Sequence, residues 1–155
     1  MIEKALIEFL HKPILACLFG TRDENLQPKV GRAFGVKINV KTDELTFFVP
    51  AFFAAKHFHN FQHNGRIAFT ACIPVSHETY QFKGQYEKHE QCSDEDHQKI
   101  KANMEAWNEF LSQYYGPQAA AEFSSINYNP AVAITFKVEH IFSQTPGPGA
   151  GKKIN

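Results

Sequence analysis

The stretch KVGRAFGVKINVKTDELTFFVPAFFAAK, residues 29–56, decides the fold that we expect for this chain. Apolar residues occupy alternate positions in its first half, the period of a half-buried β-strand. These residues are Val30, Phe34, Val36, Ile38 and Val40. Arg32 stands in the middle of this series, and burying a guanidinium without an anion costs several kcal/mol. Its partner is therefore either a carboxylate from elsewhere in the chain or a bound phosphate.

Lys37 follows Arg32 by five positions. Because successive side chains on a regular strand point to opposite faces, an odd separation places the two cations on opposite sides of the sheet. Gly31 and Gly35 offer a way out, since a glycine inside a strand pattern often marks a β-bulge, and a bulge shifts the alternation. We therefore expect Gly35 to let both cations meet one anion. The spacing leaves open the alternative that Lys37 is a solvated side chain.

The composition indicates one globular domain without a broad charged surface. The chain has 155 residues, of which 43% are hydrophobic and 15 are phenylalanine, enough for a sizeable core. Its 16 basic and 16 acidic residues give zero net charge, which argues against nucleic-acid and membrane partners. Three widely spaced cysteines favour a reducing compartment, and the N-terminal segment has neither a signal peptide nor a membrane span. We therefore expect a cytoplasmic protein.

Hydrophobic periodicity divides the chain into strands and helices. Strands are predicted over residues 14–19, 29–40, 45–49, 66–73, 79–88 and 131–142. Helices are predicted over residues 2–12, 53–63, 93–115 and 117–123. Short connections favour antiparallel pairing, and closure into a small barrel would remove exposed sheet edges. We expect one domain over residues 1–143 and a Gly/Pro tail over residues 144–155, whose composition favours disorder.

Four motifs, taken in order, carry a resemblance to a known family. They are GRxxGVK at 31–37, FFVP at 47–50, AxxAAK at 51–56 and NGRIAFTAC at 64–72. Together they look like the FMN-binding split-barrel superfamily related to pyridoxamine 5′-phosphate oxidase, over roughly residues 2–90. The resemblance implies a β-rich α+β fold, a six-stranded, mostly antiparallel split β-barrel with flanking helices. It also implies a homodimer with the flavin at the subunit interface. The alternative to a disordered tail is then a tail that reaches the partner subunit or the flavin site.

The resemblance further implies a set of FMN-binding residues. In that family an Arg-x4-Lys pair holds the flavin phosphate, and Arg32 and Lys37 match this pair with the same spacing. Lys56 matches the lysine of a turn that completes the phosphate site. The other positions implied to contact the cofactor are Phe34, Gly35, Val49, Pro50, Ala55, Thr79 and Gln81.

The turn around Lys56 departs from the family pattern. Ala54 and Ala55 stand where the family often has Ser and Arg. Two phosphate contacts are therefore either missing or replaced by backbone N–H groups, and a helix N-terminus near residues 53–56 would supply such groups to an anion. The tail also lacks the Trp and Arg with which the vitamin enzyme would hold pyridoxal phosphate, so that particular activity is not expected.

Two classes of function follow. The first is an FMN-dependent oxidoreductase acting on a small molecule, with a nicotinamide as a candidate reductant. No side chain stands out as a general acid or base, which suits chemistry carried by a cofactor. The second is a binding module: a non-catalytic flavin carrier, or a haem-binding or haem-degrading split barrel with His140 or the clustered histidines as axial ligands.

The histidines do not predict a metal site. His59 and His63 are four residues apart and could share a metal on one helix face. No acidic third ligand accompanies them and no HExxH motif is present. A solvated helix face is the simpler interpretation, so no metal is expected.

Overall fold

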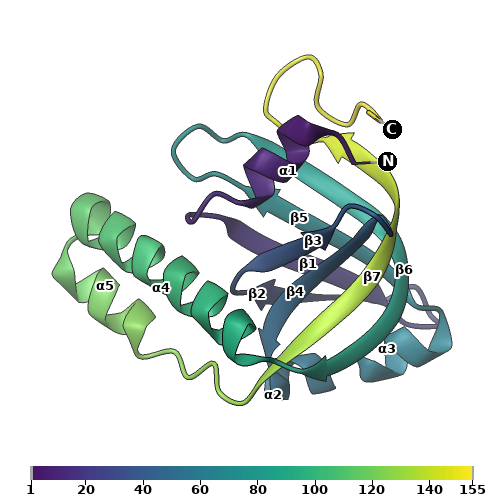
Figure 1. The fold of residues 1–155 in the computed structure, drawn as a ribbon, viewed down its shortest axis with the longest axis horizontal. Helices are drawn as coiled ribbons and strands as arrows, with labels where there is room; N and C mark the ends of the chain where they lie inside the picture. The colour runs from purple at the N-terminus through teal and green to yellow at the C-terminus, as the bar shows by residue number, and fades with distance from the viewer. Residues whose placement is uncertain (1, 155) are drawn as a thin grey trace.

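An antiparallel sheet of seven strands forms the body of the computed structural model, which describes residues 2–154 (Figure 1). The strands are β1 (Ala16–Arg22), β2 (Pro28–Ala33), β3 (Val36–Asn39), β4 (Glu44–Pro50), β5 (Arg66–Cys72), β6 (Thr79–Gln91) and β7 (Ala131–Ser143). The helices are α1 (Lys4–Leu10), α2 (Ala51–Ala55), α3 (Phe58–His63), α4 (Asp94–Tyr115) and α5 (Pro117–Ser124). Met1 and Asn155, the outer ends of the expected domain and tail, lie outside the described residues.

The seventh strand arises because the predicted strand over residues 29–40 is broken in two. β2 ends at Ala33, β3 begins at Val36, and Gly35 between them has φ +112°, which side-chain-bearing residues rarely adopt. The expected count of six strands is therefore wrong, while the β-rich α+β class with flanking helices is confirmed.

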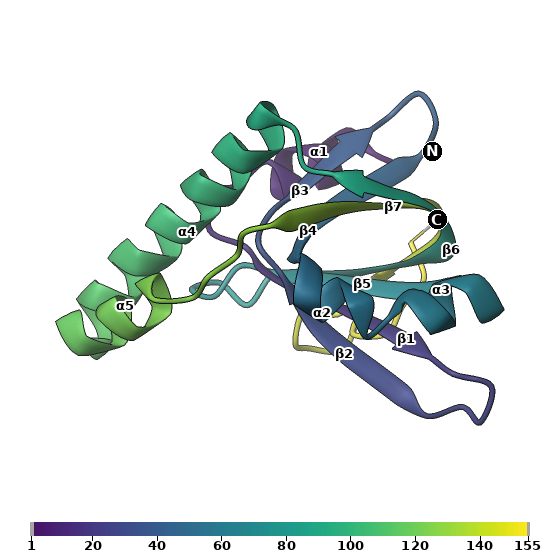
Figure 2. The same cartoon turned by 90° about the horizontal axis from the view of Figure 1, so that it is seen from below.

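The break at Gly35 also closes the sheet. The strand order is β2-β1-β5-β6-β7-β4-β3, so two strands that are consecutive in sequence lie at opposite edges. Two backbone hydrogen bonds hold the residues between β2 and β3 against β4, the neighbour of β3: Phe34 donates to the carbonyl of Phe48 at 2.9 Å, and Phe48 donates to that of Gly35 at 3.3 Å. The sheet therefore curls around a common interior, as the two views show (Figures 1 and 2).

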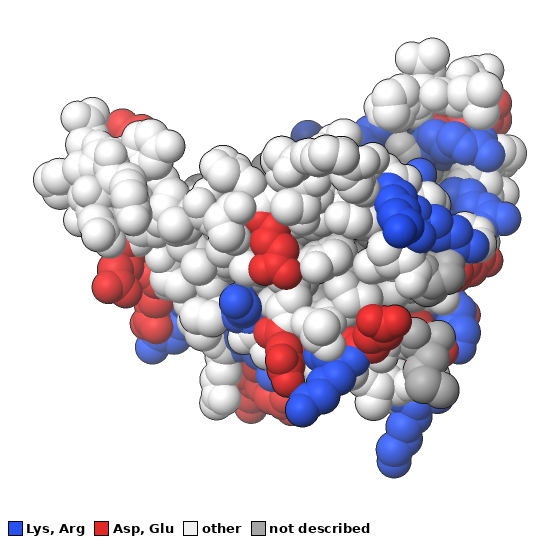
Figure 3. Space-filling model, turned by 90° about the horizontal axis from the view of Figure 1, so that it is seen from above, with Lys and Arg blue, Asp and Glu red and all other residues white. Residues whose placement is uncertain are grey.

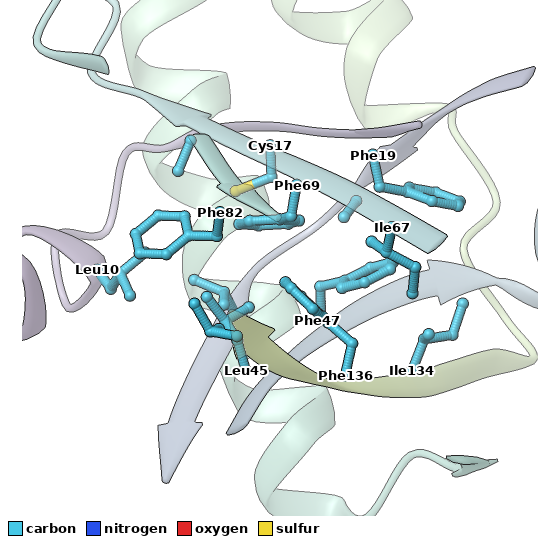
Figure 4. Close-up of a cluster of buried hydrophobic side chains, with 14 of the residues drawn as sticks. Leu10, Cys17, Phe19, Leu45, Phe47, Ile67, Phe69, Phe82, Ile134 and Phe136 are labelled. Carbon is cyan, nitrogen blue, oxygen red and sulfur yellow. The ribbon is translucent and has the colours of Figure 1, made fainter. Parts of the chain in front are cut away.

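The interior is filled by the main core, in which phenylalanine predominates (Figure 4). Phe47 lies near its centre, with ring centroids 4.8 Å from Phe19 and 5.2 Å from Phe69. Gly31 faces this core, since a Cβ there would lie 2.3 Å from the Phe19 ring. The predicted apolar face of β2 is thus wrong: Val30 is 70% exposed, because Gly31 and Ala33 point inward instead.

A second apolar cluster, called the outer cluster, lies between the sheet and the α4–α5 hairpin. Its buried members are Phe34, Phe48, Ile100, Met104, Trp107, Phe123, Ala131 and Ala133. α4 begins with the predicted Ser93 cap, completed by Asp96 as a capping box, and α5 begins with the predicted proline. The hairpin projects from the sheet as an arm (Figure 2). No helix within residues 2–154 combines the length and the apolar character needed to cross a membrane.

The tail is ordered, which contradicts the expected disorder. After the glycine-rich turn it runs antiparallel to the end of β7, where Ser143 donates to the carbonyl of Lys152 at 2.9 Å. Ile154 donates to the carbonyl of Ile141 at 2.9 Å, and Lys153 pairs with Phe142 as an isolated bridge. Gly147 and Gly151 have φ of 142° and 83°, so the composition that suggested disorder instead allows this sharp return.

Gly84 gives a test of the sheet. It lies at a register shift between β6 and β7, where a Cβ would stand 1.8 Å from the backbone oxygen of Lys137. A backbone atom cannot rotate away, so we expect Gly84→Ala to lower the free energy of unfolding in urea by at least about 2 kcal/mol. Gly20→Ala is the control, because its Cβ would meet nothing closer than 3.8 Å. Equal stability of the two variants would contradict this register.

Candidate functional site

Arg32 and Lys37 both lie on the outer surface of the barrel. Inward-facing Ala33 and Val36 belong to the main core, while Phe34 belongs to the outer cluster. The alternation therefore shifts by one between Phe34 and Val36, which confirms the expectation that the backbone at Gly35 changes the parity. Both cations border the outer cluster as a result, although their contacts differ.

The guanidinium of Arg32 is held against aromatic rings. Its central carbon lies 4.8 Å from the ring of Trp107, 5.1 Å from that of Phe123 and 5.6 Å from that of Phe34. Burial lowers the pKa of Arg32 from its usual value, yet an arginine remains protonated. None of the ion pairs within residues 2–154 includes this side chain. The internal carboxylate partner that the sequence left open is therefore not found among these residues.

Lys37 already has an anionic partner. Its Nζ donates to Oδ1 of Asp96 at 2.6 Å and lies 5.7 Å from the Phe48 ring. Burial alone would raise the pKa of Asp96, but hydrogen bonds from Lys37 and from the backbone and hydroxyl of Ser93 outweigh it and hold that pKa below its usual value. Lys37 thus ties β3 to the first turn of α4, a contact that the sequence did not predict.

The predicted positions around Lys56 are arranged differently from the expectation. The helical segment is two short helices, α2 and α3, so residues 53–56 lie at the end of α2 and not at a helix N-terminus. The amide of Lys56 donates to Phe53 at 3.2 Å, so the expected free amides are wrong at this position. Ala55 and Lys56 are exposed, and the Lys56 Nζ lies 5.6 Å from the Phe53 ring.

The remaining predicted contacts fall into buried and outward-facing groups. Val49 is fully buried in the main core, and Pro50 is also buried and precedes α2. Thr79 and Gln81 are half-buried at the start of β6, where Gln81 Nε2 donates to Oγ1 of Thr70 at 3.3 Å. Gln81 therefore lies on the outer surface of the sheet, as Arg32 does.

A buried polar network lies beside Lys56 and was not predicted. The Thr21 hydroxyl lies 2.8 Å from Nδ1 of His57 and accepts a hydrogen bond from Nδ2 of Asn60 at 2.8 Å. His57 is 2% exposed and lies 4.4 Å, centroid to centroid, from the Phe19 ring. Burial first, with Lys29 and Lys56 adding repulsion, lowers the pKa of His57 to about 4. The sequence gave no local signal, because the three residues come from β1 and the α2–α3 segment.

A cavity of about 610 Å³ lies beside the tail and contains none of the predicted flavin contacts. Its lining residues are Glu3, Tyr80, Ser143, Lys152, Lys153 and Ile154. This is the face that carries α1 and the chain ends, where many basic side chains gather on the side of β6 and β7 (Figure 3). The predicted contacts Thr79 and Gln81 flank Tyr80 on β6, so they border this cavity without lining it.

Comparison with known proteins establishes the fold. No protein-family model and no curated protein matches the sequence. HupZ from group A Streptococcus matches in structure with a TM-score of 0.56 and 18% identity, over 97% of this chain and 100% of HupZ. An FMN-binding protein from Syntrophomonas wolfei matches with 0.55 and 12% identity, over 90% and 86% of the two chains. A candidate pyridoxamine 5′-phosphate oxidase from Lactobacillus delbrueckii matches with 0.54 and 13% identity, over 92% and 93%.

The chain therefore has the split-barrel fold of the FMN-binding proteins related to pyridoxamine 5′-phosphate oxidase, as the sequence motifs indicated. At these identities the comparison shows the fold and leaves the ligand to be argued from the residues of this chain.

The contact between Lys37 and Asp96 predicts a stability effect. Lys37→Met leaves the Asp96 carboxylate, whose side chain is 4% exposed, without its cation. We expect a loss of about 2 kcal/mol in the free energy of unfolding, reduced by the partial exposure of Lys37. Lys56→Met, with no acid partner within residues 2–154, should change it by less than about 0.5 kcal/mol. Equal effects in urea denaturation would argue against the ion pair.

The His57 network predicts a pH dependence. Because the folded pKa of about 4 lies below the ordinary 6.5, the unfolded chain binds a proton more readily than the folded chain. Stability is therefore full above pH 6.5 and falls as the pH drops toward 4, by about 3 kcal/mol from this group. His57→Gln should flatten that part of the profile, whereas exposed His59→Gln should not. A profile unchanged by His57→Gln would refute the assignment.

Proposed function

We propose that this chain binds FMN on the outer surface of its barrel and acts as a flavin-dependent oxidoreductase on a small molecule. The fold supports the proposal, because a solved FMN-binding protein shares it over most of both chains. The zero net charge argues against a polyanionic partner such as nucleic acid.

Arg32 is the single observation that carries the proposal. Its guanidinium is half-buried against Trp107 and Phe123 and has no carboxylate partner within residues 2–154. A desolvated cation of this kind favours a charge-assisted hydrogen bond to an anion, and a phosphate accepts two such bonds from one guanidinium. Arg32 therefore fits the phosphate of FMN. Lys37 is neutralised by Asp96 and supplies less to that phosphate than the motif implied.

The flavin ring would supply the redox chemistry, and this chain would hold and orient it. Gln81 offers an amide on the outer surface, and Leu18, on the strand beside Arg32, offers an apolar wall that is 48% exposed. Such a shallow surface buries little of a ligand by itself. We therefore include a homodimer with the cofactor at the subunit interface, and a nicotinamide as reductant, in the proposal.

Arg32→Ala tests the phosphate role. We expect the variant to raise the Kd for FMN at least about tenfold and to leave riboflavin, which lacks the phosphate, within about twofold, because the lost contact is charge-assisted. The chain has a single tryptophan, and Trp107 lies beside Arg32, so quenching of its emission by added flavin reports binding at this place.

Arg66→Ala is the matched control, because Arg66 is exposed and paired with Glu139 at 2.7 Å. Equal loss of FMN and riboflavin in Arg32→Ala would point to a structural role for Arg32. Failure of the wild-type protein to bind either flavin would refute the proposal. A Soret band in the purified protein would favour haem instead, and NADH or NADPH oxidation by the FMN-loaded protein tests the oxidoreductase step.

A further inference from the structure

A crevice of about 150 Å³ lies where the end of α1, the linker to β1, the connection between β2 and β3, and α4 meet. Its walls include Leu10, Leu15 and Val36, each at most 8% exposed. Of the predicted flavin contacts, all of which lie within residues 2–154, Gly35 alone lines it. The crevice has room for several water molecules or for one small organic molecule.

Asn103 on α4 carries an unsatisfied acceptor in the wall of this crevice. The residue is 4% exposed, and its Nδ2 donates to the carbonyl of Pro13 at 3.0 Å and to that of Leu15 at 3.3 Å. These two bonds fix the orientation of the amide, yet its Oδ1 accepts no hydrogen bond from residues 2–154. Because bulk water does not reach this oxygen, the missing donor has to come from a molecule seated in the crevice.

The rim of the crevice is cationic. Lys12 is exposed on one side, and Lys99 stands on the α4 side, where it pairs with Glu95 at 3.3 Å. Lys12 forms no ion pair with the residues that the structure describes. No acidic residue of the described chain lines the crevice. The rim therefore favours an anionic group and disfavours a cationic one.

We propose that the crevice binds a short organic acid that carries a hydrogen-bond donor at the end away from its carboxylate. The donor pairs with Oδ1 of Asn103, the carbon chain lies against the apolar walls, and the carboxylate lies between Lys12 and Lys99. A hydroxyl suits the inner position better than an ammonium, because one amide oxygen among apolar walls does not compensate for the desolvation of a charge. The ligand class is therefore a short hydroxy acid, and its binding does not depend on a flavin.

Three four-carbon probes separate these contacts. The first, 4-hydroxybutyrate, has both polar groups, whereas butyrate lacks the hydroxyl and butane-1,4-diol lacks the charge. Each is titrated into the ¹⁵N-labelled protein without flavin, and the amide signals of Gly35 and of the Asn103 side chain are followed by NMR. We expect 4-hydroxybutyrate to bind about three to ten times more tightly than either other probe, because each of them lacks one contact. Equal affinity for the three probes overturns the proposal. So does a spectrum that no probe changes, which would leave the crevice to water.

Ala102 tests the place of binding. It lines the crevice and is exposed on α4, so Ala102→Leu fills space there without disturbing the core. We expect this variant to weaken the binding of all three probes at least about tenfold, because the added side chain and the ligand compete for the same space. Ala121→Leu is the matched control, since Ala121 is an exposed alanine on α5 that does not line the crevice. Binding that survives Ala102→Leu lies elsewhere and overturns the proposal.

Asn103→Leu tests the inner contact. The carbonyl of Leu15 keeps its hydrogen bond from Nε1 of Trp107 at 2.9 Å, so one of the two carbonyls stays satisfied in the variant. We expect the variant to bind 4-hydroxybutyrate and butyrate within about twofold of each other, because the acceptor that distinguishes them is gone. A preference for 4-hydroxybutyrate that persists in the folded variant contradicts the role of Asn103. If the variant does not fold, Ala102→Leu and the comparison of probes decide.

Lys12→Ala tests the rim. We expect it to raise the Kd of both acids about threefold and to leave the diol unchanged, because an exposed ion pair contributes modestly. Lys4→Ala is the control, since Lys4 is exposed on α1 and pairs with Glu8 at 3.6 Å. Equal effects of the two lysine variants on the acids would refute the placement of the carboxylate.

Discussion

Closure of the sheet at Gly35 is the constraint on which the rest of the structure depends. Gly35 has a positive φ of +112°, and at this residue the chain passes from one edge of the sheet to the other. The hydrogen bonds between Phe34, Gly35 and Phe48 hold this connection against β4. The same step turns Arg32 and Lys37 to the outer surface. One glycine therefore sets both the enclosure of the phenylalanine core and the placement of the cations.

The three cations of the sequence motif have separate surroundings in the structure. Arg32 lies against aromatic rings, Lys37 is held by Asp96, and Lys56 lies beside the Phe53 ring at the end of a short helix. A motif of cations therefore does not by itself define an anion site, because acidic residues distant in sequence can neutralise one of them. Here Oδ1 of Asp96 neutralises Lys37 on β3, while its Oδ2 accepts from the Ser93 amide in the capping box of α4.

Local pattern predicted much of the fold but not its long-range contacts. Ser93 and Pro117 correctly predicted the starts of α4 and α5, because a cap and a first-turn proline act only on the backbone of the adjacent helical turn. The inward face of β2 was mispredicted, because Gly31 faces the core and the Phe19 ring of neighbouring β1 fills the space that its side chain would take. The Trp107 and Phe123 rings against Arg32 come from helices more than seventy residues away, and no spacing within residues 29–56 could reveal them.

The return of the tail also changes what the end of β7 presents to solvent. β4 pairs with β7 only as far as Lys137, so residues 141–143 would otherwise leave backbone groups free on that side. The tail hydrogen-bonds to these backbone groups, and Lys152 and Lys153 lie on the resulting edge. Proteolytic removal of the last residues would expose an unpaired strand edge that can hydrogen-bond to a strand of another chain. The tail therefore blocks intermolecular strand addition at this edge.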